Sequence, residues 1–458
     1  MKVGFISLGC SKNLVDTEMM IGLFEKNKQE IVSNPADAEI ILINTCGFIE
    51  SAKQEAIDTI LEMVEYKENK CKYLIVTGCL VQRYKNELQQ ELPEVDLFIS
   101  IDEYEEFWDK IQTLIANKGE TSKKTKKVNK KIIDNLNPQI DKEKSIQQLD
   151  YLNRKITTSG YYAYLKIAEG CSNNCTYCAI PKIRGPYISR KMEEILEEAN
   201  NLSNAGVQEI IVIAQDTTKY GVDLYGEPKL TELLKKLCEM NFKWIRFLYA
   251  YPETITDELI ETVRDEEKIC KYFDIPMQHI SDSVLKRMGR RSTSDTIRKV
   301  VKKIRKEIPD VVLRTTFITG FPGETEEQFE ELKEFVKETK FDRLGVFAYS
   351  KEDGTPAVKL DGHIKISIKK SRANEIMKIQ NKISRENNET LIGKELEVLI
   401  ENITDDGKFY TGRSTREVPD DTDGVVFVKN TKELIIGDFV KAKIEKALDY
   451  DVITTIIE

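Results

Sequence analysis

Short hydrophobic runs separated by helical segments fill residues 1–117. The runs are VGFISLG (3–9), EIILINT (39–45), YLIVTG (73–78) and LFIS (97–100). Unbroken apolar runs of this length are typical of strands that are buried on both faces of a parallel sheet. The segments between them, such as DTEMMIGLFEKN, carry apolar residues at helical spacing. This βαβ pattern predicts an open parallel α/β sheet as the first domain.

Residues 118–155 interrupt this pattern. Within them, KGETSKKTKKVNKK holds seven lysines and almost no apolar residue. Such a run is usually a solvated linker, and a basic contact patch is the alternative. We expect a boundary between two domains here.

Strands and helices alternate again over residues 156–390, which we expect to form the second domain. Six consecutive βα units predict a full or partial barrel of parallel strands, and a doubly wound open sheet is the alternative. A long polar helix at about 367–390 leads out of this domain. The candidate strands are YYAYLKIA (161–168), EIIVIAQ (209–215), WIRFLYA (244–250), YFDIPM (272–277), VVLRTTFIT (311–319) and RLGVFAY (343–349).

Residues 391–458 change to short strands, which predict a small antiparallel β-barrel. From Gly393 to Glu458 there are nine Lys or Arg and fifteen Asp or Glu, a net charge of −6. A domain that holds nucleic acid is expected to be basic, so this charge favours a basic protein partner. An acidic face that only aids solubility is the alternative.

The composition fits a cytoplasmic protein of two or three domains. The chain has 458 residues, 40% hydrophobic and 32% charged, and no apolar run reaches the ~18–20 residues of a membrane span. The start, MKVGFISLGCSKN, is predicted to be a buried strand and not a signal peptide. Thiols are therefore expected to stay reduced, and the nine cysteines are candidates for metal binding or catalysis.

The motif CSNNCTYC follows the first strand of the second domain. It supplies Cys171, Cys175 and Cys178. Three thiolates at this spacing suit a 4Fe–4S cluster that leaves one iron unligated. Structural zinc is the alternative, but it usually takes four ligands and no fourth Cys or His lies nearby in sequence.

Three further cysteines each lie just after a predicted strand of the first domain. Cys10 follows VGFISLG, Cys46 follows EIILINT and Cys79 follows YLIVTG. Because ligands of open α/β sheets bind at this carboxyl edge, the three thiols are predicted to converge and to hold a second cluster. Buried core thiols are the alternative. The remaining cysteines are interpreted as small buried hydrophobes: Cys71, Cys238 and Cys270.

The CSNNCTYC motif, with Tyr177 before its last cysteine, resembles the radical S-adenosylmethionine (SAM) superfamily. The resemblance implies that the open iron binds SAM. It also implies that one-electron cleavage of SAM yields a 5′-deoxyadenosyl radical, which abstracts an unactivated hydrogen. No catalytic side chain beyond the cluster ligands is then needed, because the cofactor carries the chemistry.

Taken together, the three regions resemble the methylthiotransferase family over essentially the whole chain. This resemblance implies two 4Fe–4S clusters and a C-terminal domain of the TRAM type. It further implies that the N-terminal cluster holds the sulfur or methylthio group, that one SAM supplies the methyl group, and that another supplies the radical. The expected electron donor is a flavodoxin or ferredoxin.

The family has two branches with different substrates. One modifies an adenosine next to the tRNA anticodon, and the other modifies the β-carbon of an aspartate in ribosomal protein twelve of the small subunit. SLGCSKNLVDTE (7–18), IAQDTTKYG (213–221) and YSKEDGTPA (349–357) resemble the second branch. The tRNA branch usually has a GCQMN-like start, and an Arg-Pro pair where this chain has Glu352 and Asp353. We expect the ribosomal protein as substrate; a tRNA-modifying enzyme and a non-enzymatic iron–sulfur carrier are the alternatives.

Chemistry in barrels of this kind gathers at the carboxyl ends of the strands. ITGFPGET (318–325) resembles the superfamily's stretch beside the adenine, and a plain strand-to-helix turn capped by Thr325 is the alternative. His279 is a further candidate at such an end, or a structural residue. Arg184 and Arg190 either hold a substrate carboxylate or form structural ion pairs. The residues predicted to bind SAM are Tyr177, Gln215, Gln278, Thr319 and Gly320.

Overall fold

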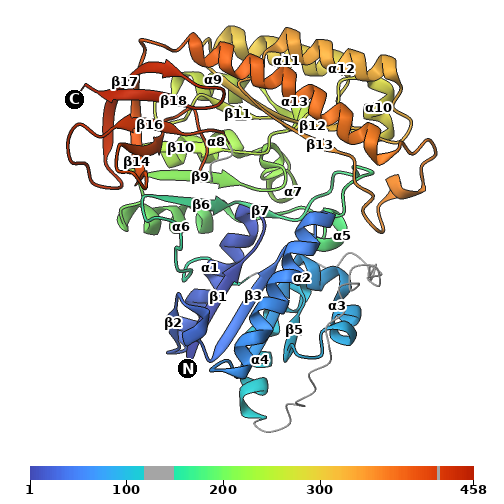
Figure 1. The fold of residues 1–458 in the computed structure, drawn as a ribbon, viewed down its shortest axis with the longest axis vertical. Coiled ribbons are helices and arrows are strands. Elements are labelled where there is room, and N and C mark those ends of the chain that lie inside the picture. The colour runs from blue at the N-terminus through green and yellow to red at the C-terminus, as the bar shows by residue number, and fades with distance from the viewer. Residues whose placement is uncertain (118–148, 420–422, 458) are drawn as a thin grey trace.

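The computed structural model describes residues 1–117, 149–419 and 423–457. In Figure 1 the N-terminal sheet lies at the bottom of the view, the central strands and helices fill the middle and top, and the C-terminal strands lie at the upper left. The Lys-rich run of the predicted linker lies outside the described residues. In the described part of the chain, no helix is both long and apolar enough to cross a membrane.

The N-terminal part is a parallel sheet with strand order β2-β1-β3-β4-β5. Every residue of β3 and β4 is buried, which explains their unbroken hydrophobic runs. The pattern predicts four of these strands and misses β2, a short edge strand without a buried residue. The strands are β1 (Lys2–Ser7), β2 (Glu30–Val32), β3 (Ile40–Thr45), β4 (Tyr73–Gly78) and β5 (Leu97–Ile99). The helices are α1 (Ser11–Lys26), α2 (Glu50–Val64), α3 (Cys79–Glu91) and α4 (Phe107–Ala116).

The six predicted strands of the central part are all present and form two parallel sheets, β6-β9-β10 and β11-β12-β13. They are β6 (Tyr162–Lys166), β9 (Glu209–Ile213), β10 (Trp244–Phe247), β11 (Tyr272–Asp274), β12 (Val312–Thr319) and β13 (Arg343–Ala348). The helices are α5 (Ile180–Arg184), α6 (Met192–Asn204), α7 (Val222–Tyr225), α8 (Leu230–Cys238), α9 (Asp257–Asp265), α10 (Asp282–Arg287), α11 (Ser294–Glu307), α12 (Glu326–Thr339) and α13 (Ile366–Glu389).

The strand order distinguishes a partial barrel from a doubly wound sheet. β10 lies beside β11, so the strands follow one another around the curve in chain order from β6 to β13. A doubly wound sheet would reverse direction at a switch point. β6 and β13 are the two edges, and the barrel is therefore partial. Outward-facing residues such as Val212, Phe273 and Phe317 pack with the surrounding helices into the largest hydrophobic core.

The C-terminal strands close into a barrel in the order β14-β15-β16-β18-β17. All neighbouring pairs are antiparallel except β16–β18, which is parallel. A closed ring of five strands must contain a parallel pair, so the predicted antiparallel barrel holds with this one correction. The strands are β14 (Glu395–Ile403), β15 (Phe409–Arg413), β16 (Val426–Lys429), β17 (Phe439–Ala447) and β18 (Val452–Ile456).

The C-terminal barrel packs against the amino ends of the central strands. Glu209, at the start of β9, forms ion pairs with Arg413 of β15 and with Arg246 of β10. The hydroxyl of Tyr272, at the start of β11, donates to Asp423 at 2.5 Å. This leaves the carboxyl ends of the central strands, where the CSNNCTYC loop lies, for the N-terminal domain to approach.

Candidate metal centre

The central thiols lie in one loop. Its ends are held together by β7 (Ala168–Glu169) and β8 (Ile188–Ser189), which pair antiparallel. Cys171 and Cys175 are buried in it, and Cys178 is partly exposed. The loop contains three thiols and no fourth Cys or His, which is the donor set of a 4Fe–4S cluster with one open iron.

Backbone hydrogen bonds anchor this loop to distant segments. The Cys171 amide donates to the carbonyl of Gly185 at 3.0 Å, and the Thr176 amide donates to that of Met288 at 2.8 Å. The Thr176 carbonyl accepts from the amide of Ala357, also at 2.8 Å. Three backbone hydrogen bonds therefore hold the loop against neighbouring segments of the protein.

Asp216, from the IAQDTTKYG segment (213–221), supports the CSNNCTYC loop from one side. Its buried carboxylate accepts hydrogen bonds from Asn173 at 2.9 Å and from Thr218 at 2.7 Å. The backbone N–H of Asn173 in turn donates to the sulfur of Cys171 at 3.4 Å. The motif thus positions the thiol loop, a role that the sequence did not reveal.

Burial shapes the chemistry of the central thiols. It raises the pKa of Cys171 to about 11 and raises that of Cys178, and the nearby charge of Cys175 adds to both shifts. Such thiols stay protonated until a metal binds, so loading the site must release protons. Among the described residues, no group of three or more His, Cys, Asp or Glu side chains is spaced for a single metal ion. The thiols of a cluster bind different irons and stand farther apart.

The three N-terminal thiol loops lie against one another at the carboxyl edge of the sheet. Cys10 precedes α1, Cys46 follows β3 and Cys79 begins α3. A Cβ added to Gly9 would lie 2.7 Å from the Cβ of Cys46, and one added to Gly47 would lie 2.9 Å from the carbonyl carbon of Cys79. The structure therefore brings together the three cysteines that the strand pattern selects.

Two helix N-termini point their positive ends toward these thiols. Cys10 is the N-cap of α1 and Cys79 is the first residue of α3, and neither helix has an acidic residue in its first turn. Burial raises the pKa of Cys46 to about 12 and also raises that of Cys79, which the Arg184 guanidinium opposes. Helix N-termini and a guanidinium both favour the thiolate form that metals require.

Gly47→Ala is expected to displace the N-terminal thiols and so to prevent them from holding the predicted second cluster. The new Cβ would lie 2.7 Å from the Cα of Leu80, which is too close for two non-bonded carbons. Because Leu80 follows Cys79 at the start of α3, relieving this clash would move Cys79 as well. Iron content per chain should fall by the share of one cluster. Gly345→Ala is the matched control, because a Cβ there meets nothing within 4 Å. Full iron content in the Gly47 variant would contradict the close packing of these loops.

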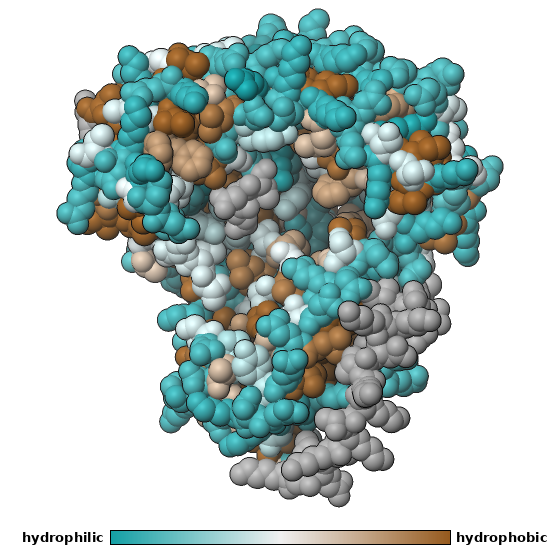
Figure 2. Space-filling model, viewed as in Figure 1, coloured by the Kyte–Doolittle hydropathy of each residue, from teal (hydrophilic) through white to brown (hydrophobic). Residues whose placement is uncertain are grey.

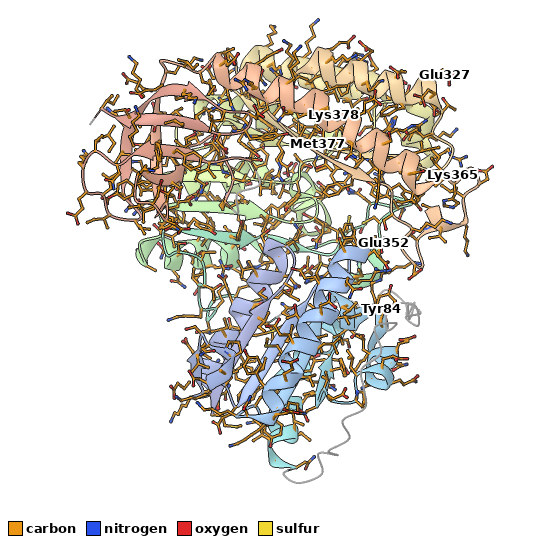
Figure 3. All side chains as sticks on the ribbon, viewed as in Figure 1. Tyr84, Glu327, Glu352, Lys365, Met377 and Lys378 are labelled. Atoms are coloured by element: carbon orange, nitrogen blue, oxygen red, sulfur yellow. The ribbon has the colours of Figure 1, made fainter. Side chains whose placement is uncertain are left out.

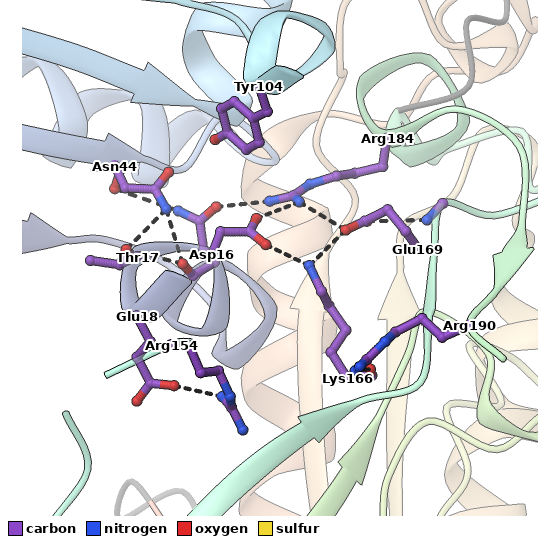
Figure 4. Close-up of polar contacts among 12 residues, drawn as sticks. Asp16, Thr17, Glu18, Asn44, Tyr104, Arg154, Lys166, Glu169, Arg184 and Arg190 are labelled. Carbon is purple, nitrogen blue, oxygen red and sulfur yellow. Dashed lines mark hydrogen bonds and ion pairs between the residues drawn. The ribbon is translucent and has the colours of Figure 1, made fainter. Parts of the chain in front are cut away.

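A buried network of charged side chains joins the two thiol sets. Arg184 of α5 donates to Asp16 at 2.6 Å, contacts Glu169 at 3.2 Å and reaches the sulfur of Cys79 at 3.5 Å. Lys166 of β6 lies between the same carboxylates, 2.5 Å from Asp16 and 2.8 Å from Glu169 (Figure 4). Two cations therefore balance two carboxylates in the seam between the domains.

The network extends into the loops on both sides. Glu169 accepts a hydrogen bond from the amide of Gly170 at 3.1 Å, directly before the central thiol loop. On the N-terminal side, Asn13 accepts from Arg184 at 2.8 Å and donates to the carbonyl of Leu8, also at 2.8 Å. The network thus fixes the position of one thiol set relative to the other.

Arg184 and Arg190 have partners within the protein. Both are buried, and Arg190 pairs with Glu198 at 2.6 Å while its guanidinium stacks 3.5 Å from the ring centre of Tyr151. Of the two interpretations of these arginines, the structure favours structural ion pairs over a site for a substrate carboxylate.

Three of the residues predicted to bind SAM lie near the central loop or at strand ends. Gln215 donates to Glu169 at 3.3 Å, and its own carbonyl oxygen is buried without a hydrogen-bond partner in the described structure. Gln278 has a left-handed backbone, with φ of 71°, and bridges to β12. Tyr177 packs edge-on against Phe321. The unsatisfied oxygen of Gln215 fits a polar ligand at this position.

Thr319 and Gly320 are occupied by protein contacts. The Thr319 hydroxyl donates to the carbonyl of Lys369 at 3.2 Å, and a Cβ on Gly320 would lie 2.3 Å from the side chain of Lys369. Thr325 caps α12 with a full capping box, as the turn interpretation of this stretch expects. These contacts explain both residues without a ligand, so their assignment to SAM stays a prediction.

His279 has a structural environment. It is fully buried, and its Nδ1 accepts a hydrogen bond from the Ser281 amide at 3.0 Å. Its Nε2 lies 3.6 Å from Glu324, which also accepts the Gly320 amide and pairs with Arg372. The Nε2 atom is buried and has no hydrogen-bond partner among the described residues, so one ring nitrogen has a structural role while the other is available to a ligand.

The acidic pair after β13 contacts the N-terminal domain. Glu352 is buried and lies 3.5 Å from Lys53 and 3.6 Å from Arg83, and the carbonyl of Asp353 accepts from Arg83 at 2.9 Å. Figure 3 shows Glu352 above Tyr84 of α3, whose hydroxyl donates to Asp353 at 3.3 Å. This pair, which sequence reasoning used only to choose a substrate branch, forms part of the domain interface.

The buried polar face of α1 was not predicted from the sequence. Lys12, Asn13, Asp16, Thr17 and Glu18 are all buried, although a helix that covers a sheet normally buries its apolar side. A run of polar residues directly after a candidate ligand is the signal that was available. Sequence reasoning used the run only as a branch motif.

Comparison with known proteins matches three family models in chain order. The uncharacterized protein family UPF0004 matches residues 2–100, the radical SAM superfamily matches residues 165–336, and the TRAM domain matches residues 392–457. Among solved structures, the radical SAM methyltransferase TsrM from Kitasatospora setae aligns with a TM-score of 0.55 at 12% identity. That alignment covers 78% of this chain and 76% of the other. It supports the fold alone.

Curated relatives match over nearly the full length. The ribosomal protein uS12 methylthiotransferase RimO of Alkaliphilus oremlandii is 60% identical, covering 98% of each chain. The protein of the same name from Acetivibrio thermocellus is 50% identical, covering 100% of this chain and 98% of the other.

Proposed function

The chain belongs to the ribosomal protein uS12 methylthiotransferase (RimO) family of radical SAM enzymes, and on that premise we propose how it carries out its reaction. The enzyme inserts a methylthio group at the β-carbon of an aspartate in ribosomal protein uS12. It works in the cytoplasm, where thiols stay reduced, and takes electrons from a flavodoxin or ferredoxin.

Two 4Fe–4S clusters serve this reaction. Cys171, Cys175 and Cys178 hold one, which together with SAM supplies the radical that activates the C–H bond. Cys10, Cys46 and Cys79 hold the other, which carries the sulfur to be transferred. The observation that carries this proposal is the Arg184 guanidinium, which touches the sulfur of Cys79 on one side and Glu169 beside the central loop on the other.

Residues of the chain bind and orient SAM at the central loop. Gln215 offers an unsatisfied buried oxygen there, which suits the amino group of the methionine part of SAM. Tyr177 and Gln278 lie at the same end of the barrel, and we retain Thr319 and Gly320 as candidates beside the adenine. Water is excluded by the hydrophobic side chains around Phe321.

The substrate protein approaches through the open side of the central barrel. A cavity of about 470 Å³ lies there, lined by residues of β12, β13 and the C-terminal barrel, among them Asp342, Asp423 and Asp451. Figure 2 shows the molecule hollowed on this face, beside the C-terminal barrel and below α13. Arg314 and Arg343 line the same cavity, so its wall carries both signs of charge. The net charge of −6 in the C-terminal domain suits a basic protein and repels RNA.

A competition between two substrates tests this function. The anaerobically reconstituted enzyme receives SAM, reductant, sulfide, a peptide with the aspartate loop of uS12, and an anticodon stem-loop RNA. We expect mass spectrometry to find the methylthio group on the peptide alone. Methylthiolation of the RNA alone would establish the tRNA enzyme instead. Failure to cleave SAM at all would leave only the iron–sulfur carrier.

A further inference from the structure

We propose that Lys12 binds the carboxylate of the substrate aspartate, in a site at the seam between the N-terminal and central domains. This inference rests on the proposed function and adds to it the group that recognises the reacting side chain.

Lys12 is a buried cation that forms no direct ion pair within the described residues. It is the second residue of α1, two positions after Cys10, and only 8% of its surface is exposed. Its ammonium lies 3.6 Å from the ring centre of Tyr249 in the central domain. Within the described residues, no oxygen accepts a hydrogen bond from this ammonium and no carboxylate lies within ion-pair distance of it. A nearby negative charge is that of Asp274, where the charge of Lys12 opposes the rise in pKa that burial causes. Burying an ammonium in this way is unfavourable unless a ligand supplies the missing charge.

The other buried cations around the thiols differ from Lys12 in this respect. Each has an acceptor of its own: Lys166 and Arg184 have Asp16 and Glu169, Arg190 has Glu198, and Arg290 has the carbonyl of Pro276. The half-buried Arg314 has Asp274 and Asp423.

Tyr249 is held under the ammonium in an unfavourable conformation. Its φ is +65°, in the left-handed region that residues with a side chain rarely adopt. Two contacts maintain it, because its amide donates to Asp274 at 3.1 Å and its carbonyl accepts from the amide of Thr217, also at 3.1 Å. Backbone strain that the surroundings enforce is characteristic of ligand sites.

A series of residue contacts links the cavity on the open side of the barrel to Lys12. Arg314 lines the cavity on the open side of the barrel, and its Nε lies 3.9 Å from Asp274. Asp274 accepts the amide of Tyr249, whose ring carries the ammonium of Lys12. Arg314, Asp274 and Tyr249 thus connect the wall of this cavity with Lys12.

The chemistry of the substrate fits this site. An aspartate carboxylate is bonded directly to the β-carbon, so fixing it also fixes the hydrogen to be abstracted. Lys offers three donors and no acceptor, so it favours a carboxylate over a neutral amide. A hydrogen bond to a charged partner corresponds to roughly a tenfold to hundredfold difference in affinity.

Binding of paired peptides to the reconstituted enzyme tests the assignment. Labelled uS12 peptides with aspartate or asparagine at the target position are titrated without reductant, so that no turnover occurs. We expect the wild type to prefer the aspartate peptide by about tenfold or more, and Lys12→Met to lose this preference. Lys26→Met, the same change at an exposed position of the same helix, should retain it.

Two further measurements separate ligand binding from a structural role. Lys12→Met should unfold at the same or a higher temperature than the wild type, because an unpaired buried charge is gone. Lys12→Gln serves as a second neutral variant if the first does not fold. An unchanged preference for the aspartate peptide in both variants would overturn the assignment. A loss of iron in the variants would also overturn it, because it would show that Lys12 balances the charge of the cluster instead of binding substrate. Wild-type methylthiolation of the peptide in those cases would leave the proposed function intact.

Discussion

Replacing Cys171, Cys175 and Cys178 together by alanine is expected to abolish both SAM cleavage and methylthio transfer. The three thiols are the whole donor set of the central loop, and no side chain nearby in sequence can substitute for them. Without the open iron that these thiols are proposed to hold, SAM loses the metal contact through which the electron reaches it. 5′-Deoxyadenosine production should fall to background, and iron should fall by the share of one cluster.

The same change at Cys10, Cys46 and Cys79 is expected to give a different result. The central loop is anchored by its own hydrogen bonds, so SAM cleavage should persist while the peptide gains no methylthio group. A triple alanine variant of the remaining cysteines should keep both activities and all the iron: Cys71, Cys238 and Cys270. Chromatography of 5′-deoxyadenosine and mass spectrometry of the peptide measure the two steps separately. Equal loss of both steps in the two thiol sets would contradict separate roles.

Arg184→Met is expected to destabilise the protein by about 3–5 kcal/mol, the usual effect of breaking a buried ion pair from one side. Asp16 and Glu169 would then share only Lys166, and a surplus negative charge would stay in the seam. Burial opposes ionisation of Glu169, yet Lys166 and Arg184 together hold its pKa down at about 2. Loss of the guanidinium removes part of that support. Denaturant unfolding of the variant and the wild type measures the difference.

A second substitution shows whether charge balance is the cause. Adding Asp16→Asn to Arg184→Met removes one carboxylate and should recover part of the lost stability, which a double-mutant cycle quantifies. Arg385→Met is the control, because Arg385 and its partner Asp449 are both exposed and their pair should not affect unfolding measurably. If the double variant is as unstable as the sum of the single variants, the network is not balanced in the way that the contacts indicate.

The sequence by itself was sufficient to predict the three-part architecture and the two sets of clustered cysteines. Unbroken hydrophobic runs gave the parallel strands, since a strand buried on both faces has no polar positions, as in β3 and β4. Chain order then placed Cys10, Cys46 and Cys79 at one edge of the sheet. The three cysteines of CSNNCTYC lie within eight residues of one another, so a cluster site could be predicted from them without knowledge of the fold.

The roles of polar residues whose partners lie far away in the chain could not be predicted from the sequence. Asp16 and Arg184 are separated by 168 positions, and Arg83 and Asp353 by 270. A charged residue in a sequence is equally compatible with solvent, an ion pair or a ligand, because nothing local reports its burial. Sequence reasoning therefore left Arg184 open and used Glu352 only as a branch marker.

The tertiary structure decided these cases by showing what each charge touches. Folding brings α1 against β6 and the loop after β13 against α3, and in doing so it gives partners to nearly every buried charge around the thiols. Only when those pairs are known does Lys12 differ from the other buried cations, because it forms no direct ion pair. Hydrophobic periodicity is a property of neighbours in sequence, whereas the neutralisation of a buried charge depends on neighbours in space, so only the folded chain identifies the cation that still needs a ligand.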